Sequence, residues 1–251
     1  MANSASGDSV TERIVRVLET FSTERTVQTA AEIGRRAGLP SSTAHRMVAE
    51  LVASGLLERD GARRVRLGMR LWELAGRGSR ALRLRQAALP WMERVQARVR
   101  EHTQLAVLEH GEALFLERLS SPTAGANITR IAGRLPLHAS SSGLVLLAFA
   151  PDDEREAVLA APLLPVSAET ILEPQALRAR LAAIRRDGFV VAEGSIEQVS
   201  TGVAVPVRDG RGPVIAALSV VLPREAPTAG AVEELRAAAA GISAALGSAG
   251  R

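Results

Sequence analysis

The first third of the chain carries apolar residues at the 3.6-residue spacing of amphipathic helices. From Val10 this pattern predicts a first helix that ends near Phe21. A second helix is predicted from Thr29, which suits an N-cap because Glu32 follows three residues later, to Gly38. A third helix is predicted from the run "STAHRMVAELVASGLLER", whose apolar face consists of Ala44, Met47, Val48 and Leu51. The pattern therefore indicates three consecutive helices, with a tight turn between the second and the third.

A hairpin is predicted directly after the third helix. The segment "GLLERDGARRVRLG" contains two short strand-like runs around the dipeptide Asp60-Gly61, a strong signal for a two-residue turn. Three helices followed by a hairpin are the components of a winged helix-turn-helix domain. We assign this domain to residues 10–69.

The segments on either side of this domain differ from it in composition and residue pattern. Residues 1–9 are small and polar, and we expect a disordered tail there. From Met69 a helical stretch follows, with predicted breaks near Gly76–Gly78 and at Pro90. Its part over residues 70–85 is the expected linker helix.

Beyond about residue 86, alternating apolar and polar positions typical of strands appear between helical runs. Strands are predicted in "LAVLEHGEALFLERL", "ITRIAGRLPL", "GFVVAEG", "STGVAVPVRD" and "GPVIAALSVVLP". Helices are predicted from about Ser141, over "EPQALRARLAAIRRDG", and over the alanine-rich C-terminal run. A few antiparallel strands with helices segregated around them make an α+β domain, which we place at residues 86–251.

The amino-acid composition excludes several classes of functional site. The chain has no cysteine, which excludes disulfides, thiolate metal sites and cysteine nucleophiles. Its first residues contain no apolar core region, and no stretch approaches 18 uninterrupted apolar residues, so we expect no signal peptide, no membrane partner and a cytoplasmic location.

Charge is divided unevenly along the chain. Residues 1–86 hold 15 arginines and nine acidic residues, a net charge of +6, whereas the remainder holds 16 arginines and 18 acidic residues, a net charge of −2. A basic first third is the electrostatic footprint of a polyanion-binding domain, so the charge agrees with a helix-turn-helix that binds DNA.

The segment "GLPSSTAHRM", from Gly38 to Met47, is the expected start of the DNA-reading helix. Its short hydroxyl residues allow close approach to the major groove, and a helix N-terminus favours a phosphate. We expect Arg46 to read a guanine. The predicted DNA contacts are Ser41, Ser42, Thr43, His45 and Arg46 of this helix, Arg35 and Arg36 of the helix before it, and Arg63 and Arg64 beside the hairpin turn. The alternative is that the hydroxyl run only caps the helix and the arginines form a solvated face.

A second candidate site lies in "LPLHASSSG", where a loop precedes a helix. The backbone N–H groups of Ser140, Ser141 and Ser142 are candidates for an anion site at that helix N-terminus, and an ordinary N-cap is the alternative. His138 beside these serines suggests a hydrolase, but no G-x-S-x-G elbow is present, and we expect His138 to orient the loop. No cofactor or metal is predicted, since the nearby histidines and glutamates match no metal-binding spacing.

The chain resembles the IclR family of bacterial transcription regulators. The resemblance rests on "TAAEIGRRAGLPSSTAHRMVAELVASGLLERDGARRVRLGMRLWELA" in the first half and on "RIAGRLPLHASSSGLVLLA", "RRDGFVVAEG" and "GVAVPVRDGRGPVIAALSV" in the second. It implies a GAF-like effector-binding domain and homodimers, or dimers of dimers, on palindromic double-stranded operators. Many members carry a basic residue where this chain has Ser41, which weakens the case for a phosphate contact there.

The resemblance also implies an effector site. In this family the serine loop holds the carboxylate of small acid effectors, and the residues implied to contact the effector are Leu135, Ser140, Ser141, Ser142, Glu193, Gly202 and Ser219. Relatives commonly have an acidic pair near Ala192 and Glu193 and a cysteine at Gly202. These departures remove polar anchors and open volume, so we expect an effector that is bulkier or less polar than glyoxylate-sized acids, such as an aromatic or branched carboxylate.

Together these observations predict a ligand-responsive, DNA-binding transcription regulator that is not an enzyme. The alternative function is a small-molecule-binding enzyme or hydrolase with an incidental winged helix.

Overall fold

The computed structural model describes residues 8–61, 63–122, 124 and 127–248. It divides into two compact units between Arg80 and Ala81, and each is described by itself. Among the described residues, no helix combines the length and the hydropathy needed to cross a bilayer.

Three helices form the first unit: α1 (Val10–Glu19), α2 (Ala30–Arg36) and α3 (Ser41–Ala53). The predicted capping box of the second helix is confirmed, because Thr29 accepts from the Glu32 N–H while the Glu32 carboxylate accepts from the Thr29 N–H at 2.8 Å. A second capping box joins Ser9 to Glu12 at the start of α1. The predicted tail over 1–9 otherwise lies outside the described residues, except for Asp8, which is ion-paired with Arg16.

The predicted hairpin is confirmed as β2 (Leu57–Asp60) and β3 (Arg64–Leu67), which pair antiparallel around Gly61. A two-residue strand that the sequence pattern did not reveal, β1 (Gln28–Thr29), pairs with β3, so the described residues form a three-stranded sheet in the order β1-β3-β2. The core below it joins all three helices to the hairpin and includes Val17, Ile33, Met47, Leu51, Leu57 and Val65.

Two helices cover the predicted linker region, α4 (Met69–Gly76) and α5 (Arg80–Val99). The predicted break near Gly76 is confirmed, but the predicted break at Pro90 is wrong, because α5 continues through it. A proline inside a helix loses one backbone hydrogen bond. Burial of Ala88 and Met92 on either side of it favours continuation.

The second unit is built on strands β4 (His102–Glu109), β5 (Glu112–Leu119), β6 (Arg134–Pro136), β7 (Val190–Glu193), β8 (Ser200–Arg208) and β9 (Val214–Pro223). Within the described residues they form one antiparallel sheet in the order β6-β5-β4-β9-β8-β7. The helices are α6 (Ser141–Ala148), α7 (Asp152–Ala160), α8 (Pro174–Asp187) and α9 (Ala229–Ser248), of which α7 was not predicted. The predicted α+β fold class, with its winged helix-turn-helix and antiparallel sheet, is confirmed.

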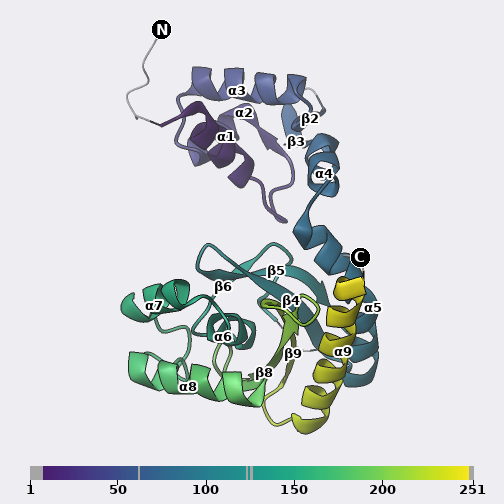
Figure 1. Cartoon of the computed structure of the whole chain (residues 1–251). Helices are drawn as coiled ribbons and strands as arrows, with labels where there is room; N and C mark the ends of the chain where they lie inside the picture. The colour runs from purple at the N-terminus through teal and green to yellow at the C-terminus, as the bar shows by residue number, and fades with distance from the viewer. Residues whose placement is uncertain (1–7, 62, 123, 125–126, 249–251) are drawn as a thin grey trace. The chain divides into compact units, whose positions relative to one another are not determined.

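The two faces of this sheet carry side chains of different size. Helices α5 and α9 cover one face (Figure 1), and the sheet supplies large apolar residues there: Leu105, Val203, Val205, Leu218 and Val220. Helices α6, α7 and α8 cover the other face, where the central strands supply Ala106, Ala204 and Ala217. Because small residues lie beneath it, α6 sits deep in the unit, with every residue from Ser141 to Ala148 buried.

Candidate DNA-binding and effector-binding sites

The turn between α2 and α3 is built on two glycines. Gly38 has a φ of +64°, which favours glycine, and it leads the chain into the tight turn. A Cβ at Gly34 would lie 2.8 Å from the Ala44 Cβ, so α2 and α3 pack closely because residue 34 has no side chain. This packing leaves Ser42, His45 and Arg46 exposed on the outer face of α3, at the i, i+3 and i+4 spacing of one helix face.

The hydroxyl residues at this helix start do not cap it. Pro40 is the N-cap residue, and no side chain hydrogen-bonds to the first turn of α3. The alternative that the serine–threonine run caps the helix is therefore wrong. Pro40, with its fixed φ, occupies the capping position, which places Ser41 and Ser42 inside the first turn with exposed side chains.

The predicted arginines differ in their surroundings. Arg35, Arg63 and Arg64 are exposed, whereas Arg36 donates to the side chain of the buried Gln28 in β1. On the hairpin, the sequence analysis did not single out Arg59, which is also exposed. The structure therefore brings basic side chains to the hairpin and to the exposed face of α3, while Arg36 is already engaged within the fold.

A carboxylate joins the hairpin to helix α4. The backbone N–H of Met69 donates to the Glu58 carboxylate at 2.7 Å, and Arg66 donates to it from the opposite strand at 3.3 Å. The hydrogen bond from the Met69 N–H lowers the pKa of Glu58 most, and the hydrogen bond from Arg66 lowers it further. The stabilisation that the ionised carboxylate provides is therefore complete above its ordinary pKa and is lost as the pH falls through the lowered value.

In the second unit, a cavity lies between the N-terminal end of α6, the sheet and two loops. Its walls border about 420 Å³ of space not filled by atoms, a volume that includes solvent at the open side. Five of the predicted effector residues line it: Leu135, Ser140, Ser141, Ser142 and Gly202. Ser219 is fully buried and contacts the lining through its hydrogen bond with Ser142. Glu193 is exposed and lies outside the lining.

The N-terminus of α6 opens onto this cavity. The Ser140 hydroxyl accepts from the Gly143 N–H at 3.0 Å, and the Ser140 carbonyl accepts from the Leu144 N–H at 2.8 Å. These bonds leave the backbone N–H groups of Ser141 and Ser142 as the donors of the first turn for a bound anion. The cap and the anion site are therefore compatible, because they use different N–H groups.

A chain of side-chain hydrogen bonds runs along the cavity wall. The Ser142 hydroxyl donates to the Ser219 hydroxyl at 2.8 Å. The Ser219 hydroxyl donates to the side-chain oxygen of Gln104 at 3.5 Å. The Gln104 amide donates to the Thr129 hydroxyl, which donates to the side-chain oxygen of Asn127. Gln104, Thr129 and Asn127 were not predicted from the sequence. The single available signal was Gln104, a polar residue among apolar ones in a buried strand.

The expected extra volume at Gly202 does not add to the cavity. A Cβ at this position would lie 2.5 Å from the Ser141 hydroxyl oxygen and 3.0 Å from the Ser141 Cβ. The space that a side chain at Gly202 would need is therefore taken by Ser141. That part of our expectation is wrong, because α6 packs directly on the glycine.

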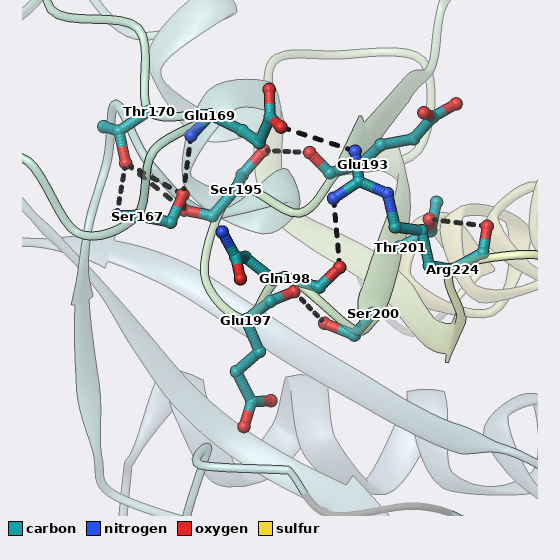
Figure 2. A network of polar contacts seen from close by, with 10 residues as sticks. All are labelled: Ser167, Glu169, Thr170, Glu193, Ser195, Glu197, Gln198, Ser200, Thr201 and Arg224. Carbon is teal, nitrogen blue, oxygen red and sulfur yellow. Dashed lines mark hydrogen bonds and ion pairs between the residues drawn. The ribbon is translucent and has the colours of Figure 1, made fainter.

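The loop between β7 and β8 forms another wall, with Ser195, Glu197 and Ser200 on the lining. Figure 2 shows how this loop is held from outside. The Ser167 hydroxyl donates to the Ser195 carbonyl at 3.0 Å, and the Arg224 guanidinium donates to the Gln198 carbonyl at 3.0 Å. A polar network that lies outside the cavity therefore positions this wall.

His138 takes a structural position. The Nε2 atom of His138 lies 2.9 Å from the Leu164 carbonyl oxygen, so His138 ties the serine loop to the segment after α7. No group of three or more histidines or carboxylates suited to a metal ion occurs in the part of the chain that the structure describes.

Comparisons with known proteins cover almost the whole chain. Residues 10–61 match the model of the IclR helix-turn-helix domain, and residues 79–244 match the model of the bacterial transcriptional regulator IclR C-terminal domain. The HTH-type transcriptional regulator XynR of Escherichia coli (strain K12) is 31% identical over 211 residues, which cover 83% of this chain and 84% of XynR.

Solved structures of the same family are also similar. An IclR homologue from Microbacterium hydrocarbonoxydans, complexed with 4-hydroxybenzoate, is 62% identical and superposes with a TM-score of 0.91 over 95% of this chain and 99% of its own. An IclR homologue from Microbacterium sp. strain HM58-2 is 61% identical, with a TM-score of 0.63 over 94% of this chain and 97% of its own. The chain belongs to the IclR family of bacterial transcriptional regulators, and it is a DNA-binding regulator rather than an enzyme.

Proposed function

We propose that the second unit senses a small aromatic carboxylate and that this binding controls how the first unit binds a palindromic operator. The observation that carries the proposal is the cavity at the α6 N-terminus, in a chain 62% identical to a relative complexed with 4-hydroxybenzoate. The free N–H groups of Ser141 and Ser142 suit a carboxylate, and Phe115, Leu135 and Val221 on the lining suit an aromatic ring.

For DNA recognition we propose that the exposed face of α3 enters the major groove. Arg46 is the residue we assign to a guanine, and Ser42, Thr43 and His45 lie beside it. Arg63 and Arg64 at the tip of the hairpin contact the flanking backbone, and Arg35 contributes a phosphate contact. Arg36 contributes less to phosphate binding, because its guanidinium already donates a hydrogen bond to the Gln28 side chain.

We further propose that the regulator acts as a homodimer or as a pair of dimers. Helix α4 buries none of its residues, and Met69 and Trp72 on it are 62% and 60% exposed. A second copy of the chain would cover these apolar side chains, and a two-fold dimer would match the symmetry of a palindromic operator.

The test is a fluorescence-anisotropy titration of the full chain with a duplex that carries the region upstream of its own gene, with and without 4-hydroxybenzoate. We expect the acid to change the DNA affinity at least about fivefold, a usual allosteric coupling. The substitution Arg46→Ala should cost about 1–3 kcal/mol and relax specificity at one base position.

Arg186→Ala is the matched control, because Arg186 is an exposed arginine of the second unit that pairs with the adjacent Asp187. It should leave DNA binding unchanged. Equal affinity of the wild-type chain for the upstream duplex and for random DNA would overturn the proposed regulation.

A further inference from the structure

Charge on the cavity wall is confined to one side chain. Among the described residues that line the cavity, Glu197 is the only charged residue, and none is arginine or histidine. The Glu197 carboxylate has no hydrogen-bond or ion-pair partner in the described part of the chain. In Figure 2 it extends away from Arg224, whose guanidinium donates to Glu169 and to the Gln198 carbonyl. An acid effector therefore enters a cavity that already holds an uncompensated carboxylate.

An unpaired donor lies on the same lining. The side-chain oxygen of Asn127 accepts from both the N–H and the hydroxyl of Thr129, and these two bonds settle which side-chain atom is the oxygen. The amide nitrogen Nδ2 is shielded from solvent and has no acceptor in the described residues. A buried amide without a partner destabilises the fold, so this atom is poised for an oxygen atom of a ligand.

The hydrogen-bonding groups left free on the lining define the ligand. Among the described residues on the lining, free donors are the N–H groups of Ser141 and Ser142 and the Asn127 amide, and the charged acceptor without a partner is the Glu197 carboxylate. The Ser141 hydroxyl has no partner there either and can donate or accept. A carboxylate on the ligand satisfies helix N–H groups, whereas only a ligand group with a hydrogen to donate satisfies Glu197. A hydroxyl can do so, because it both donates and accepts.

We infer that Glu197 and Asn127 select effectors that carry a single carboxylate and a hydroxyl, and that Glu197 excludes acids with a second carboxylate. This inference rests on the proposed function, since it concerns the same cavity. Glu197 acts on selectivity through charge: within a partly enclosed cavity, a second ligand carboxylate would lie within several ångströms of it, where repulsion lowers affinity by at least about tenfold.

The experiment measures the binding of benzoate, 4-hydroxybenzoate and 4-carboxybenzoate to the full chain by isothermal titration calorimetry. For the wild-type protein we expect 4-hydroxybenzoate to bind about tenfold more tightly than benzoate, and 4-carboxybenzoate to bind more weakly than benzoate. The variant Glu197→Gln keeps an acceptor but loses the charge. Its affinity for 4-carboxybenzoate relative to benzoate should rise at least about tenfold. Its affinity for 4-hydroxybenzoate should exceed that for benzoate by about threefold only.

A second variant removes the donor and also adds a negative charge to the wall. Asn127→Asp keeps the oxygen that Thr129 needs but replaces the Nδ2 donor with an acceptor, so affinity for 4-hydroxybenzoate should fall at least about tenfold. Glu173→Gln, which removes an exposed carboxylate of the second unit outside the lining, is the control and should leave all three affinities unchanged. Melting temperatures without ligand verify that the variants fold.

The possible failures are distinct. If benzoate and 4-hydroxybenzoate bind and Glu197→Gln leaves the ratio of dicarboxylate to monocarboxylate affinities unchanged, the selective role of Glu197 is wrong and the proposed effector class stands. If neither the wild type nor any variant binds any of the three acids, the proposed effector class itself is overturned, and the selectivity with it.

Discussion

At the scale of single residues, the effector cavity depends on small side chains below the start of α6. Ser219 and Gly202 lie on the strands there, and Ser141 occupies the space where a Cβ at Gly202 would be. The same serine supplies one of the two free N–H groups at the helix start. Packing against Gly202 should therefore be coupled to the proposed effector binding through Ser141.

Gly202→Ala tests this coupling. The new Cβ would lie 2.5 Å from the Ser141 hydroxyl oxygen and would displace the start of α6. We expect a destabilisation of about 1–3 kcal/mol, typical of overpacking, and a loss of 4-hydroxybenzoate affinity of at least about tenfold. Melting temperatures and calorimetric titration measure the two effects.

Gly230→Ala provides the control for this glycine series, because no atom lies within 4 Å of the position of its Cβ. It should leave the 4-hydroxybenzoate affinity unchanged and should not lower the melting temperature, because alanine favours a helix over glycine. An unchanged affinity of Gly202→Ala for 4-hydroxybenzoate would show that Ser141 does not contribute to the effector site.

At the scale of elements, the wall between β7 and β8 is held by residues that do not touch the cavity. Thr170 and Ser167 hold it from the segment after α7, and Arg224 holds it from the end of β9. The loop itself carries Ser195 and Glu197 on the lining. Loosening the outer network should therefore change how long an effector stays bound while the donors inside the cavity remain.

Arg224→Gln removes the guanidinium that joins Gln198 to Glu169. We expect the dissociation rate of 4-hydroxybenzoate to rise by about tenfold, since the wall opens more often, with DNA affinity in the absence of effector unchanged. Stopped-flow displacement measures the rate. Arg211→Gln, an exposed residue of the β8–β9 turn, is the control. A dissociation rate equal to that of the wild type would exclude the Arg224 contacts as the restraint.

The sequence predicts most elements because their signals are local. The capping box of Thr29 and Glu32, and the turns at Asp60-Gly61 and His110-Gly111, join residues that are close in the chain. The failures have long-range causes. Helix α5 passes through Pro90 because Ala88 and Met92 are buried in the second unit's core, and β1 exists because Gln28 pairs with Val65.

At the scale of the whole molecule, the unequal distribution of charge sets the response to salt. Residues 1–86, which contain the whole first unit, carry +6 and the remainder −2, so we expect DNA association to be driven by this part of the chain. Each arginine that neutralises a phosphate releases counterions, which makes the logarithm of the affinity fall linearly with the logarithm of the salt concentration.

Arg64→Ala should weaken binding to specific and random duplexes alike and reduce the salt slope by about one. Anisotropy titrations at several salt concentrations measure this slope. Arg178→Ala is the matched control, because Arg178 pairs with Glu156 in the second unit at 2.6 Å, and it should keep the wild-type slope. A slope of Arg64→Ala equal to that of the wild type would remove Arg64 from the phosphate contacts.

The amino-acid sequence alone determined most of the helices and strands and the α+β fold class with its helix-turn-helix, since helix periodicity, capping and turns arise from residues a few positions apart. It also indicated the serine loop at the start of α6. Only the tertiary structure decided what surrounds that loop. Gln104, Asn127 and Glu197 come from segments far apart in the chain, and they share one cavity because the sheet order places β4 beside β9 and the β7–β8 loop over α6. Their chemistry depends on which partners packing leaves unsatisfied, and no local pattern of residues encodes that.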